Sequence, residues 1–256
     1  MGSVLVAFSG GVDSTFLATI SKDVLGSRSV AVTAYSPSMT QDDLEETKSL
    51  AKNLGLKHMI IETDELSNPE YIANGLRRCY FCKVELYTKL MPIATELTLS
   101  YVISGTNIDD LGDYRPGMKA GQEYGVRNPM VEAGLNKNDI RQLSKERSLP
   151  TWDKPAQPCL SSRIPYGTPV SIESLTKIGK AESLLRNEGL KEFRVRHHDT
   201  IARSEILPND IQILLQDDLR ESLVKDMKAI GYEYITVDLS GFKSGSLNPS
   251  IHKRNL

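Results

Sequence analysis

Residues 4–14 read Val-Leu-Val-Ala-Phe-Ser-Gly-Gly-Val-Asp-Ser. Their apolar beginning is typical of a short buried strand, and Phe16, Ile20 and Val24 follow at the spacing of one helix face. A glycine turn between a strand and a helix leaves the first backbone N–H groups of the helix facing an anion, which the helix dipole favours. This stretch therefore predicts a strand, a phosphate-binding loop and a helix.

The residue types in this loop suit a nucleotide phosphate. Gly10 and Gly11 allow the backbone to come close to a ligand, and Ser9 and Ser14 add hydroxyl donors. A carboxylate repels phosphate, so Asp13 is predicted to hold Mg²⁺ or to orient the loop. The stretch is neither Gly-x-x-x-x-Gly-Lys nor Gly-x-Gly-x-x-Gly, which distinguishes it from two common nucleotide loops. A glycine–serine turn without a ligand is the alternative.

Strand-like and helix-like segments alternate through the first 150 residues. Further strands are predicted at 29–35, 58–62 and 101–104, and further helices at 40–55, 83–97 and 136–148. This order is typical of an α/β domain whose parallel sheet is covered by helices on both faces. Ligands of such sheets bind beyond the carboxyl ends of the strands, where the phosphate loop and the turn at 105–107 both lie.

The composition changes at 152–169, a segment that contains four prolines and is predicted to be a loop. Beyond it a small α+β unit is predicted, with helices at 171–187 and 219–230 and strands at 193–196, 201–206 and 234–239. We therefore expect a first domain at 1–155, a cysteine-containing linker at 156–169 and a second domain at 170–256.

The overall charge and hydropathy restrict the partners of the chain. The formal net charge is −2 and the pI is about 6.1, which disfavours a dedicated nucleic-acid binder. No apolar run approaches the roughly 20 residues of a membrane span, and no signal peptide is visible. The sequence predicts a cytoplasmic protein that does not enter a membrane.

The chain has three cysteines, Cys79, Cys82 and Cys159, and this odd number disfavours a disulfide framework. The spacing of the first pair is that of metal ligands, and neighbouring cations favour the thiolate. A structural zinc site wants a fourth ligand, for which the histidines show no pattern. Three thiolates suit a [4Fe–4S] cluster with one open iron. Buried inert thiols remain the alternative.

The loop at 9–14 resembles that of the PP-loop ATP pyrophosphatases, which cleave ATP to AMP and pyrophosphate and adenylate a substrate. In that superfamily the segment after the fourth strand closes over the nucleotide and supplies acidic groups. The resemblance implies that Gly105 and Thr106 bind ATP and that Asp109 and Asp110 are further Mg²⁺ ligands. A plain turn with a solvated acidic pair is the alternative.

Several motifs along nearly the whole chain resemble one family of that superfamily, LarE. They are the phosphate loop, Arg78-Cys79-Tyr80-Phe81-Cys82-Lys83, Lys154-Pro155, Cys159-Leu160-Ser161-Ser162-Arg163-Ile164-Pro165-Tyr166-Gly167 and Arg194-Val195-Arg196-His197-His198. LarE proteins are sulfur transferases in the synthesis of the nickel-pincer nucleotide of lactate racemase. They adenylate a carboxylate of pyridinium-3,5-biscarboxylate mononucleotide and convert it to a thiocarboxylate.

The resemblance also implies the roles of the cysteines. One LarE subtype gives up the sulfur of a single cysteine, here Cys159, and keeps dehydroalanine in its place. A second subtype also has the Cys-x-x-Cys pair and uses a [4Fe–4S] cluster with sulfide or another sulfur donor. The three cysteines of this chain favour the second subtype, with Cys79, Cys82 and Cys159 as cluster ligands.

The substrate implied by the resemblance carries one phosphate and two carboxylates. We expect Arg163, Arg194 and Arg196 to bind its phosphate, because arginine makes planar two-point contacts with such groups. Together with Cys159 and Asp13, Lys83 and Arg163 are the expected catalytic residues. Ordinary surface arginines are the alternative. The resemblance further implies a homo-oligomer.

Three other functions share parts of this pattern. A tRNA thiolase would share adenylation and the cysteines but would need a surface for RNA. A synthetase that uses ammonia would not need the cysteines. A non-catalytic carrier of a cluster or cofactor would not turn ATP over to AMP.

Overall fold

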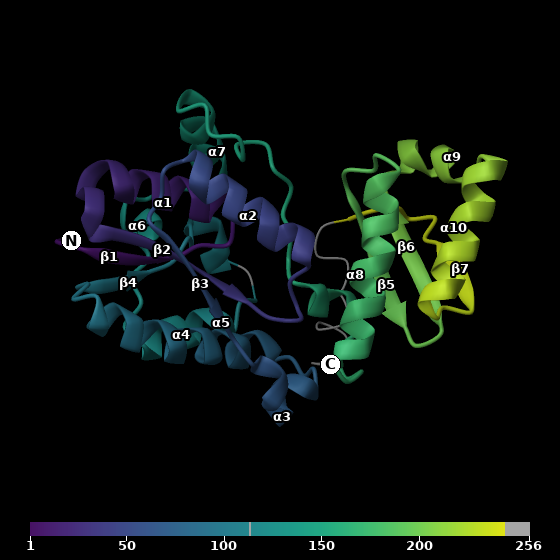
Figure 1. Cartoon of the computed structure of the whole chain (residues 1–256), viewed down its shortest axis with the longest axis horizontal. Coiled ribbons are helices and arrows are strands. Elements are labelled where there is room, and N and C mark those ends of the chain that lie inside the picture. The colour runs from purple at the N-terminus through teal and green to yellow at the C-terminus, as the bar shows by residue number, and fades with distance from the viewer. Residues whose placement is uncertain (113, 244–256) are drawn as a thin grey trace. The chain divides into compact units, whose positions relative to one another are not determined.

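A parallel four-stranded sheet lies at the centre of the first of two units (Figure 1). Its strand order is β3-β2-β1-β4, and all three strand pairs are parallel. The strands are β1 (Val4–Ala7), β2 (Ser29–Tyr35), β3 (His58–Glu62) and β4 (Tyr101–Ile103). The expected α/β class with a parallel sheet is confirmed.

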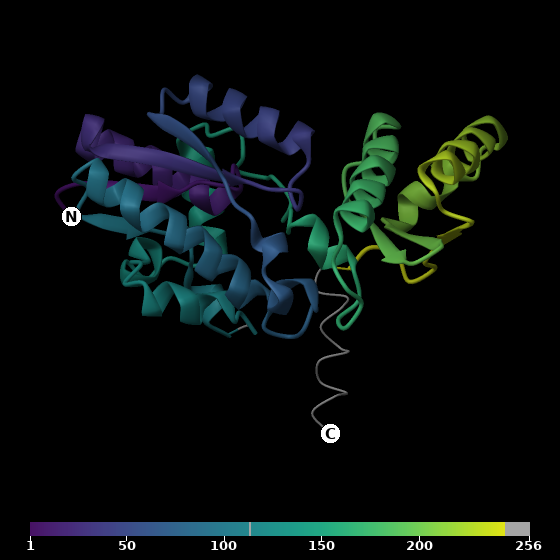
Figure 2. The same ribbon diagram turned by 60° about the horizontal axis from the view of Figure 1, so that its bottom comes forward.

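Helices cover both faces of this sheet (Figures 1 and 2). Val4 and Val6 of β1 pack into a core with α1 (Val12–Leu25), α2 (Gln41–Asn53) and α7 (Lys137–Glu146). Leu5, between them, points to the opposite face, where it packs with α4 (Arg78–Glu96) and α5 (Gly117–Glu123). Because successive residues of β1 are buried on both faces of the sheet, its sequence is continuously apolar and does not alternate between apolar and polar residues.

Helix α4 begins at Arg78, five residues before the predicted start at Lys83. Among the described residues, no side chain caps its first turn, so the sequence holds no start signal there. The Arg77 guanidinium lies 5.3 Å from the centre of the Phe81 ring, which helps to fix this first turn. Cys79 and Cys82 therefore lie in the first two turns of α4.

The second unit is built on a three-stranded mixed sheet of order β5-β6-β7. Its strands are β5 (Phe193–His198), β6 (Ile201–Ile206) and β7 (Tyr234–Val237). The helices α8 (Ile172–Asn187) and α10 (Asp217–Ile230) supply the other half of its core, and Phe193 and Val195 are buried against them. The alternate residues Arg194 and Arg196 point to the other face of β5. This unit confirms the expected small α+β part.

The remaining elements are single turns between these strands and helices. They are η1 (Gly26–Arg28), η2 (Glu65–Ser67), α3 (Pro69–Ile72), η3 (Ile108–Gly112), α6 (Pro129–Glu132), η4 (Leu160–Arg163), η5 (Pro208–Asp210) and α9 (Ile211–Leu214).

The structure is a computed structural model that describes residues 1–112 and 114–243. Its contacts group residues 1–71 and 77–157 in the first unit, and residues 72–76 and those from Pro158 onward in the second. The expected domains at 1–155 and 170–256 stay a prediction, and residues 244–256 of the second lie outside the described residues. Within the described ranges, none of the helices is both long and apolar enough to cross a bilayer.

Candidate functional site

The phosphate loop joins the end of β1 to the start of α1. Gly10 has a φ of 70°, in the left-handed region that favours glycine. A Cβ on Gly10 would lie only 2.7 Å from Oγ1 of Thr47, so the loop also needs glycine for space. The backbone N–H of Ser9 donates to Oγ of Ser14 at 3.2 Å, and Oγ of Ser14 donates to the carbonyl of Gly11 at 3.1 Å. The loop is thus closed on itself around the first turn of α1.

The turn after β4 passes directly against this loop. A Cβ on Gly105 would lie 3.0 Å from the backbone nitrogen of Ser14 and 3.2 Å from its Cα. Only glycine allows two backbone segments to approach so closely. Oγ of Ser104 donates to Oδ1 of Asn128 at 2.6 Å and lies 3.0 Å from Oγ1 of Thr106. The structure therefore brings Gly105 and Thr106 to the phosphate loop.

The carboxylate of Asp13 lies between a cation and an amide. Nζ of Lys137, in the first turn of α7, makes an ion pair with Oδ2 of Asp13. Nδ2 of Asn107 donates to Oδ1 at 3.2 Å. Asn107 lies in the turn after β4, and Lys137 is the first residue of α7. Asp13 is therefore held in one orientation beside the start of α1.

Asp109 and Asp110 are occupied by the backbone around them. Oδ2 of Asp110 accepts from the N–H of Asn107 at 3.0 Å, and Oδ2 of Asp109 accepts from the N–H of Lys137 at 2.9 Å. The two carboxylates thus shape the turn that holds Asn107 and Lys137 against Asp13. Their predicted role as Mg²⁺ ligands stays a prediction.

Lys154 contacts the phosphate loop from the end of the first unit. Its Nζ donates to the carbonyl of Gly10 at 3.3 Å and to Oε1 of Glu46 at 2.8 Å. Arg141 holds the same segment by donating to the carbonyls of Trp152 and Lys154 at 2.7 and 2.9 Å. Two lysines, Lys137 and Lys154, therefore flank the loop.

The Cys-x-x-Cys pair begins helix α4. Cys79 and Cys82 are three residues apart and partly exposed, so they share one helix face. Nη2 of the buried Arg78 lies 3.9 Å from Sγ of Cys79. Nζ of Lys83 lies 5.9 Å from the centre of the Tyr87 ring. The pair therefore lies at the N-terminus of a helix, with the Arg78 guanidinium beside Sγ of Cys79.

Cys159 is exposed and precedes the short helix η4. The next turn holds Arg163, whose Nε and Nη2 each lie 2.9 Å from a carboxylate oxygen of Glu182 on α8. Both side chains are buried. Nη1 of Arg163 donates to the carbonyls of Pro158 and Cys159 and to Oγ of Ser162.

Arg194 and Arg196 are also buried on β5. Nη2 of Arg196 donates to Oε2 of Glu205 at 2.8 Å, and its Nη1 donates to the carbonyl of Ser162 at 2.8 Å. Burial, and then the charge of Arg163, lower the pKa of Arg194 to about 10. The guanidinium of Arg194 lies 5.0 Å from the centre of the Phe242 ring. The predicted phosphate contacts of the three arginines stay a prediction.

The side chains at the site can be compared with the ligands that Mg²⁺ and an iron–sulfur cluster require. Among the described residues, no three His, Cys, Asp or Glu side chains gather as metal ligands. Mg²⁺ commonly uses one or two carboxylates and completes its shell with water and substrate phosphates. Asp13 beside the phosphate loop fits that use. The thiols of Cys79, Cys82 and Cys159 have the softness that iron–sulfur clusters require.

Sequence reasoning missed Lys137. Its only signal was the pattern Asn136-Lys137-Asn138-Asp139, which resembles a helix start. A capping box is indeed present, since Asn136 and Asp139 exchange side-chain and backbone hydrogen bonds. That α7 begins beside Asp13 depends on the packing of α7 against α1, which no local pattern contains.

Known proteins resemble this chain over nearly its whole length. The NAD synthase family profile matches residues 1–70. An uncharacterized protein of Synechocystis sp. is 47% identical over 249 residues, which cover 97% of this chain and 93% of that protein. The pyridinium-3,5-bisthiocarboxylic acid mononucleotide synthase of Lactiplantibacillus plantarum is 37% identical over 254 residues, which cover 99% of this chain and 91% of the synthase.

More distant relatives cover the chain to different extents, and an uncharacterized protein of Methanocaldococcus jannaschii is 28% identical over 241 residues, which cover 94% of this chain and 91% of that protein. A glutamine-hydrolyzing GMP synthase component of Sulfurisphaera tokodaii is 26% identical over 162 residues, which cover 58% of this chain and 44% of that protein. The GMP synthase component therefore matches a little over half of this chain, whereas the Synechocystis and Lactiplantibacillus relatives match 97% and 99% of it. The chain belongs to the LarE family of sulfur transferases, within the PP-loop ATP pyrophosphatases.

Proposed function

We propose that this enzyme adenylates a carboxylate of pyridinium-3,5-biscarboxylate mononucleotide and converts it to a thiocarboxylate, as a step toward a nickel-pincer nucleotide. The observation that carries this proposal is the 37% identity to the Lactiplantibacillus plantarum synthase over 99% of the chain. The presence of all three cysteines in the sequence supports sulfur chemistry over the use of ammonia.

The nucleotide half of the reaction belongs to the first unit. Backbone N–H groups at the start of α1, with the hydroxyls of Ser9 and Ser14, bind the β- and γ-phosphates of ATP. Gly105 and Thr106 close the other side of this loop. A carboxylate oxygen of the substrate attacks the α-phosphorus, the bond to the β-phosphate breaks, and pyrophosphate leaves.

Asp13 binds the Mg²⁺ that accompanies ATP, and Asp109 and Asp110 are further candidate ligands. The ion neutralises charge on the leaving pyrophosphate. Nζ of Lys137, which pairs with Asp13, lies beside the phosphate loop. A lysine there can donate to phosphate oxygens, so Lys137 joins the proposed pyrophosphate site.

The sulfur half of the reaction depends on the cysteines. Sulfur attacks the acyl carbon of the adenylate, the bond from that carbon to the AMP oxygen breaks, and the thiocarboxylate remains. Cys79, Cys82 and Cys159 would hold a [4Fe–4S] cluster. Such a cluster would supply an iron without a protein ligand that can take up sulfide from a separate donor. Lys83 and Arg194 bind the anionic groups of the substrate, whereas the hydrogen bonds of Arg163 and Arg196 go to Glu182, to Glu205 and to the backbone.

The first experiment is anaerobic reconstitution with iron and sulfide, followed by iron counting and an absorbance spectrum. About four irons per chain, lost when any one cysteine is replaced by alanine, support the cluster route. No iron uptake, together with conversion of Cys159 to dehydroalanine after one turnover, would replace it with a route in which Cys159 gives up its own sulfur.

Turnover separates the two halves of the reaction. Cys159→Ala should abolish thiocarboxylate formation while pyrophosphate release continues, and Gln157→Ala, two residues away in sequence, should behave as the unmodified enzyme. Asp13→Ala should abolish pyrophosphate release. Asp23→Ala is its control, because Asp23 lies on the same helix and its ion pair is with Arg147 at the surface. Thiocarboxylate formation by Cys159→Ala would refute the proposed sulfur chemistry.

A cytoplasmic location and a homo-oligomeric state complete the proposal. The homo-oligomeric state follows from the resemblance to the family, whereas the location rests on the hydropathy of the sequence and the absence of a nucleic-acid partner on its net charge of −2. A gel-shift assay with bulk tRNA tests the last point, because a tRNA thiolase would bind it.

A further inference from the structure

The backbone of the segment 158–168, which carries Cys159, turns a series of carbonyl groups toward the interior of the second unit. Six of these carbonyls accept hydrogen bonds from three side chains, Arg163, Arg196 and Asn74. Each of the three residues is at least 94% buried. The Cys159 side chain, by contrast, is exposed.

Arg163 holds the beginning of this segment. Its Nη1 donates to the carbonyl of Pro158, and to that of Cys159 at 3.2 Å. Its other two nitrogens bind both oxygens of Glu182, and Oε1 of Glu182 also accepts from the N–H of Val195 at 3.0 Å. The guanidinium is therefore fixed in its plane by α8 and β5, and the turn at Cys159 is fixed by the guanidinium.

Arg196 holds the middle of the segment in the same manner. Nη1 donates to the carbonyl of Ser162, while Nη2 pairs with Oε2 of Glu205 on the neighbouring strand. Glu205 is also paired with Arg203 at 3.2 Å. Arg196 is thus a charged side chain of β5 whose far end contacts the Cys159 segment rather than solvent.

Asn74 holds the end of the segment. Its Nδ2 donates to the carbonyls of Pro165 and Thr168 at 2.9 and 2.8 Å and lies 3.4 Å from that of Ile164. Its own backbone carbonyl accepts from the N–H of Gly167 at 3.0 Å. Asn74 is fully buried and has a φ of 51°, a strained conformation for most residues that asparagine tolerates better.

We propose that Arg163, Arg196 and Asn74 are positioning residues that immobilise the 158–168 segment and thereby present the Cys159 thiol in a single orientation. This inference rests on the proposed function in so far as Cys159 is taken as the sulfur-transfer residue. The buried guanidinium groups of Arg163 and Arg196 bond to carboxylates on one side and to the backbone of the 158–168 segment on the other. They therefore order this segment. Holding a reacting atom within a few tenths of an ångström is a large part of catalysis.

The expected consequence differs from that of a substrate-binding arginine. Loss of a positioning contact frees the turn, so it lowers the rate of the step that uses Cys159 and leaves the affinity for substrate unchanged. Loss of a phosphate contact raises the KM for the mononucleotide and leaves the turn ordered.

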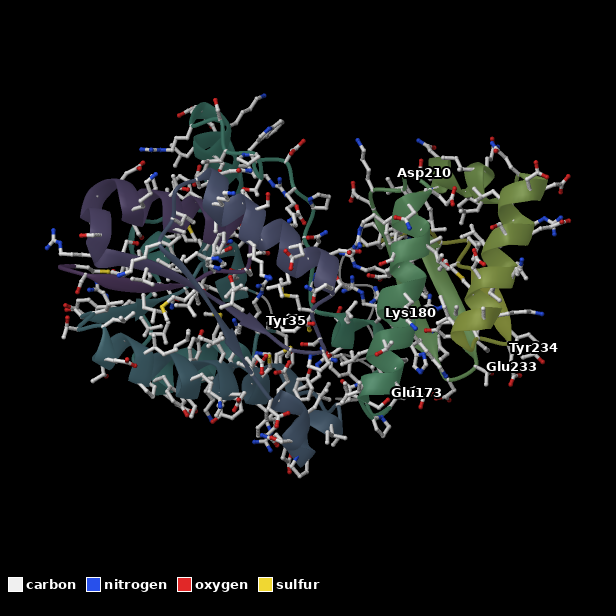
Figure 3. All side chains as sticks on the ribbon, viewed as in Figure 1. Tyr35, Glu173, Lys180, Asp210, Glu233 and Tyr234 are labelled. Atoms are coloured by element: carbon white, nitrogen blue, oxygen red, sulfur yellow. The ribbon has the colours of Figure 1, made fainter. Side chains whose placement is uncertain are left out.

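The test uses the full chain and begins with hydrogen exchange of the turn. The N–H groups of Ser162, Ile164 and Gly167 are hydrogen-bonded within this arrangement. In Glu182→Gln, which removes the charge that orients Arg163, their exchange should accelerate about tenfold. Glu173→Gln is the matched control: Glu173 lies on the same helix, pairs with Lys177 and is exposed (Figure 3). In Glu173→Gln these three N–H groups should exchange at the same rate as in the unmodified chain.

The second measurement is kinetic. Arg163→Lys keeps the charge but loses the planar fork, so thiocarboxylate formation should fall about tenfold in kcat, with the KM for the mononucleotide within about twofold and pyrophosphate release retained. Glu173→Gln should leave all three values unchanged. If Glu182→Gln does not fold, Arg163→Lys carries the exchange test instead.

Two results would overturn the proposal. One is unchanged exchange of the turn in the folded Glu182→Gln or Arg163→Lys chain. The other is a raised KM with unchanged kcat, which assigns Arg163 to the substrate. The hydrogen-exchange measurement needs no substrate. If the chain shows no sulfur transfer, the proposed function is refuted, but the exchange result still shows whether these residues order the turn at Cys159.

Discussion

At the scale of single residues, the phosphate loop depends on how closely two backbone segments approach each other. Gly105 touches the backbone of Ser14, and backbone atoms cannot swing aside as the end of a side chain can. Gly105→Ala should therefore push the β4 turn away from the loop, destabilise the fold by about 1–3 kcal/mol and raise the KM for ATP. Urea unfolding and pyrophosphate release measure the two effects.

A matched glycine lies only seven residues further on. A Cβ on Gly112 would meet open space, so Gly112→Ala should change neither the ATP affinity nor the stability by more than about 0.5 kcal/mol. If the two variants have the same stability and the same KM for ATP, the close approach at Gly105 is not needed for ATP binding.

Lys137 is the second residue on which the nucleotide site depends. Lys137→Met keeps much of the side-chain volume but removes the cation paired with Asp13, so pyrophosphate release should fall about 10- to 100-fold. Lys145→Met, on the same helix with its Nζ over the Trp152 ring, should release pyrophosphate at the normal rate. A normal rate in Lys137→Met would remove Lys137 from the site.

At the scale of elements, the start of helix α7 sets the place of Lys137. Asn136 and Asp139 form a capping box, and loss of such a cap costs about 1 kcal/mol. Asn136→Ala should lower the free energy of unfolding by that amount and also slow pyrophosphate release, because Lys137 is the next residue. The exposed Asn138 is the control, and Asn138→Ala should do neither.

The strands of both units and their longer helices could be predicted because their periodicity is local, whereas the short helices α3, α5, α6 and α9 were not predicted. Strand β1, the glycine loop and helix α1 follow one another directly in the sequence. The alternation of buried residues along β5 likewise lies within one short stretch. The start of α4 could not be predicted, because no side chain in the described part of the chain caps it. The partners of Arg163 and Arg196 could not be predicted either, since Glu182 and Glu205 join them only through the packing of α8 and β6 on β5.

At the scale of the whole molecule, the described histidines act together on stability. Burial lowers the pKa of His58, His197 and His198 below the ordinary value of 6.5. The unfolded chain then binds more protons than the folded one below about pH 7, so stability rises with pH in that range. The loss begins as pH falls through 6.5 and is complete below the folded pKa values.

Urea midpoints at about pH 7 and about pH 5 measure this effect, with the lower midpoint expected at the lower pH. The carboxylates whose pKa is lowered, such as Glu132 and Asp238, start from 4.5 and 3.8, so they contribute little change in that interval. His197→Gln should reduce the difference between the two midpoints. A midpoint that rises on acidification would contradict the sign of the histidine shifts.

The hydrogen bonds from Asn74 to the segment at 164–168 also set an order of events during synthesis of the chain. Residues 72–76 leave the ribosome before the segment at 164–168 that they bind, and 94 residues separate Asn74 from Thr168. At about 5–20 residues per second, this separation corresponds to a wait of about 5–20 s. During that wait the rest of the first unit is completed, so the nascent nucleotide half is made before the turn that carries Cys159 can be fastened.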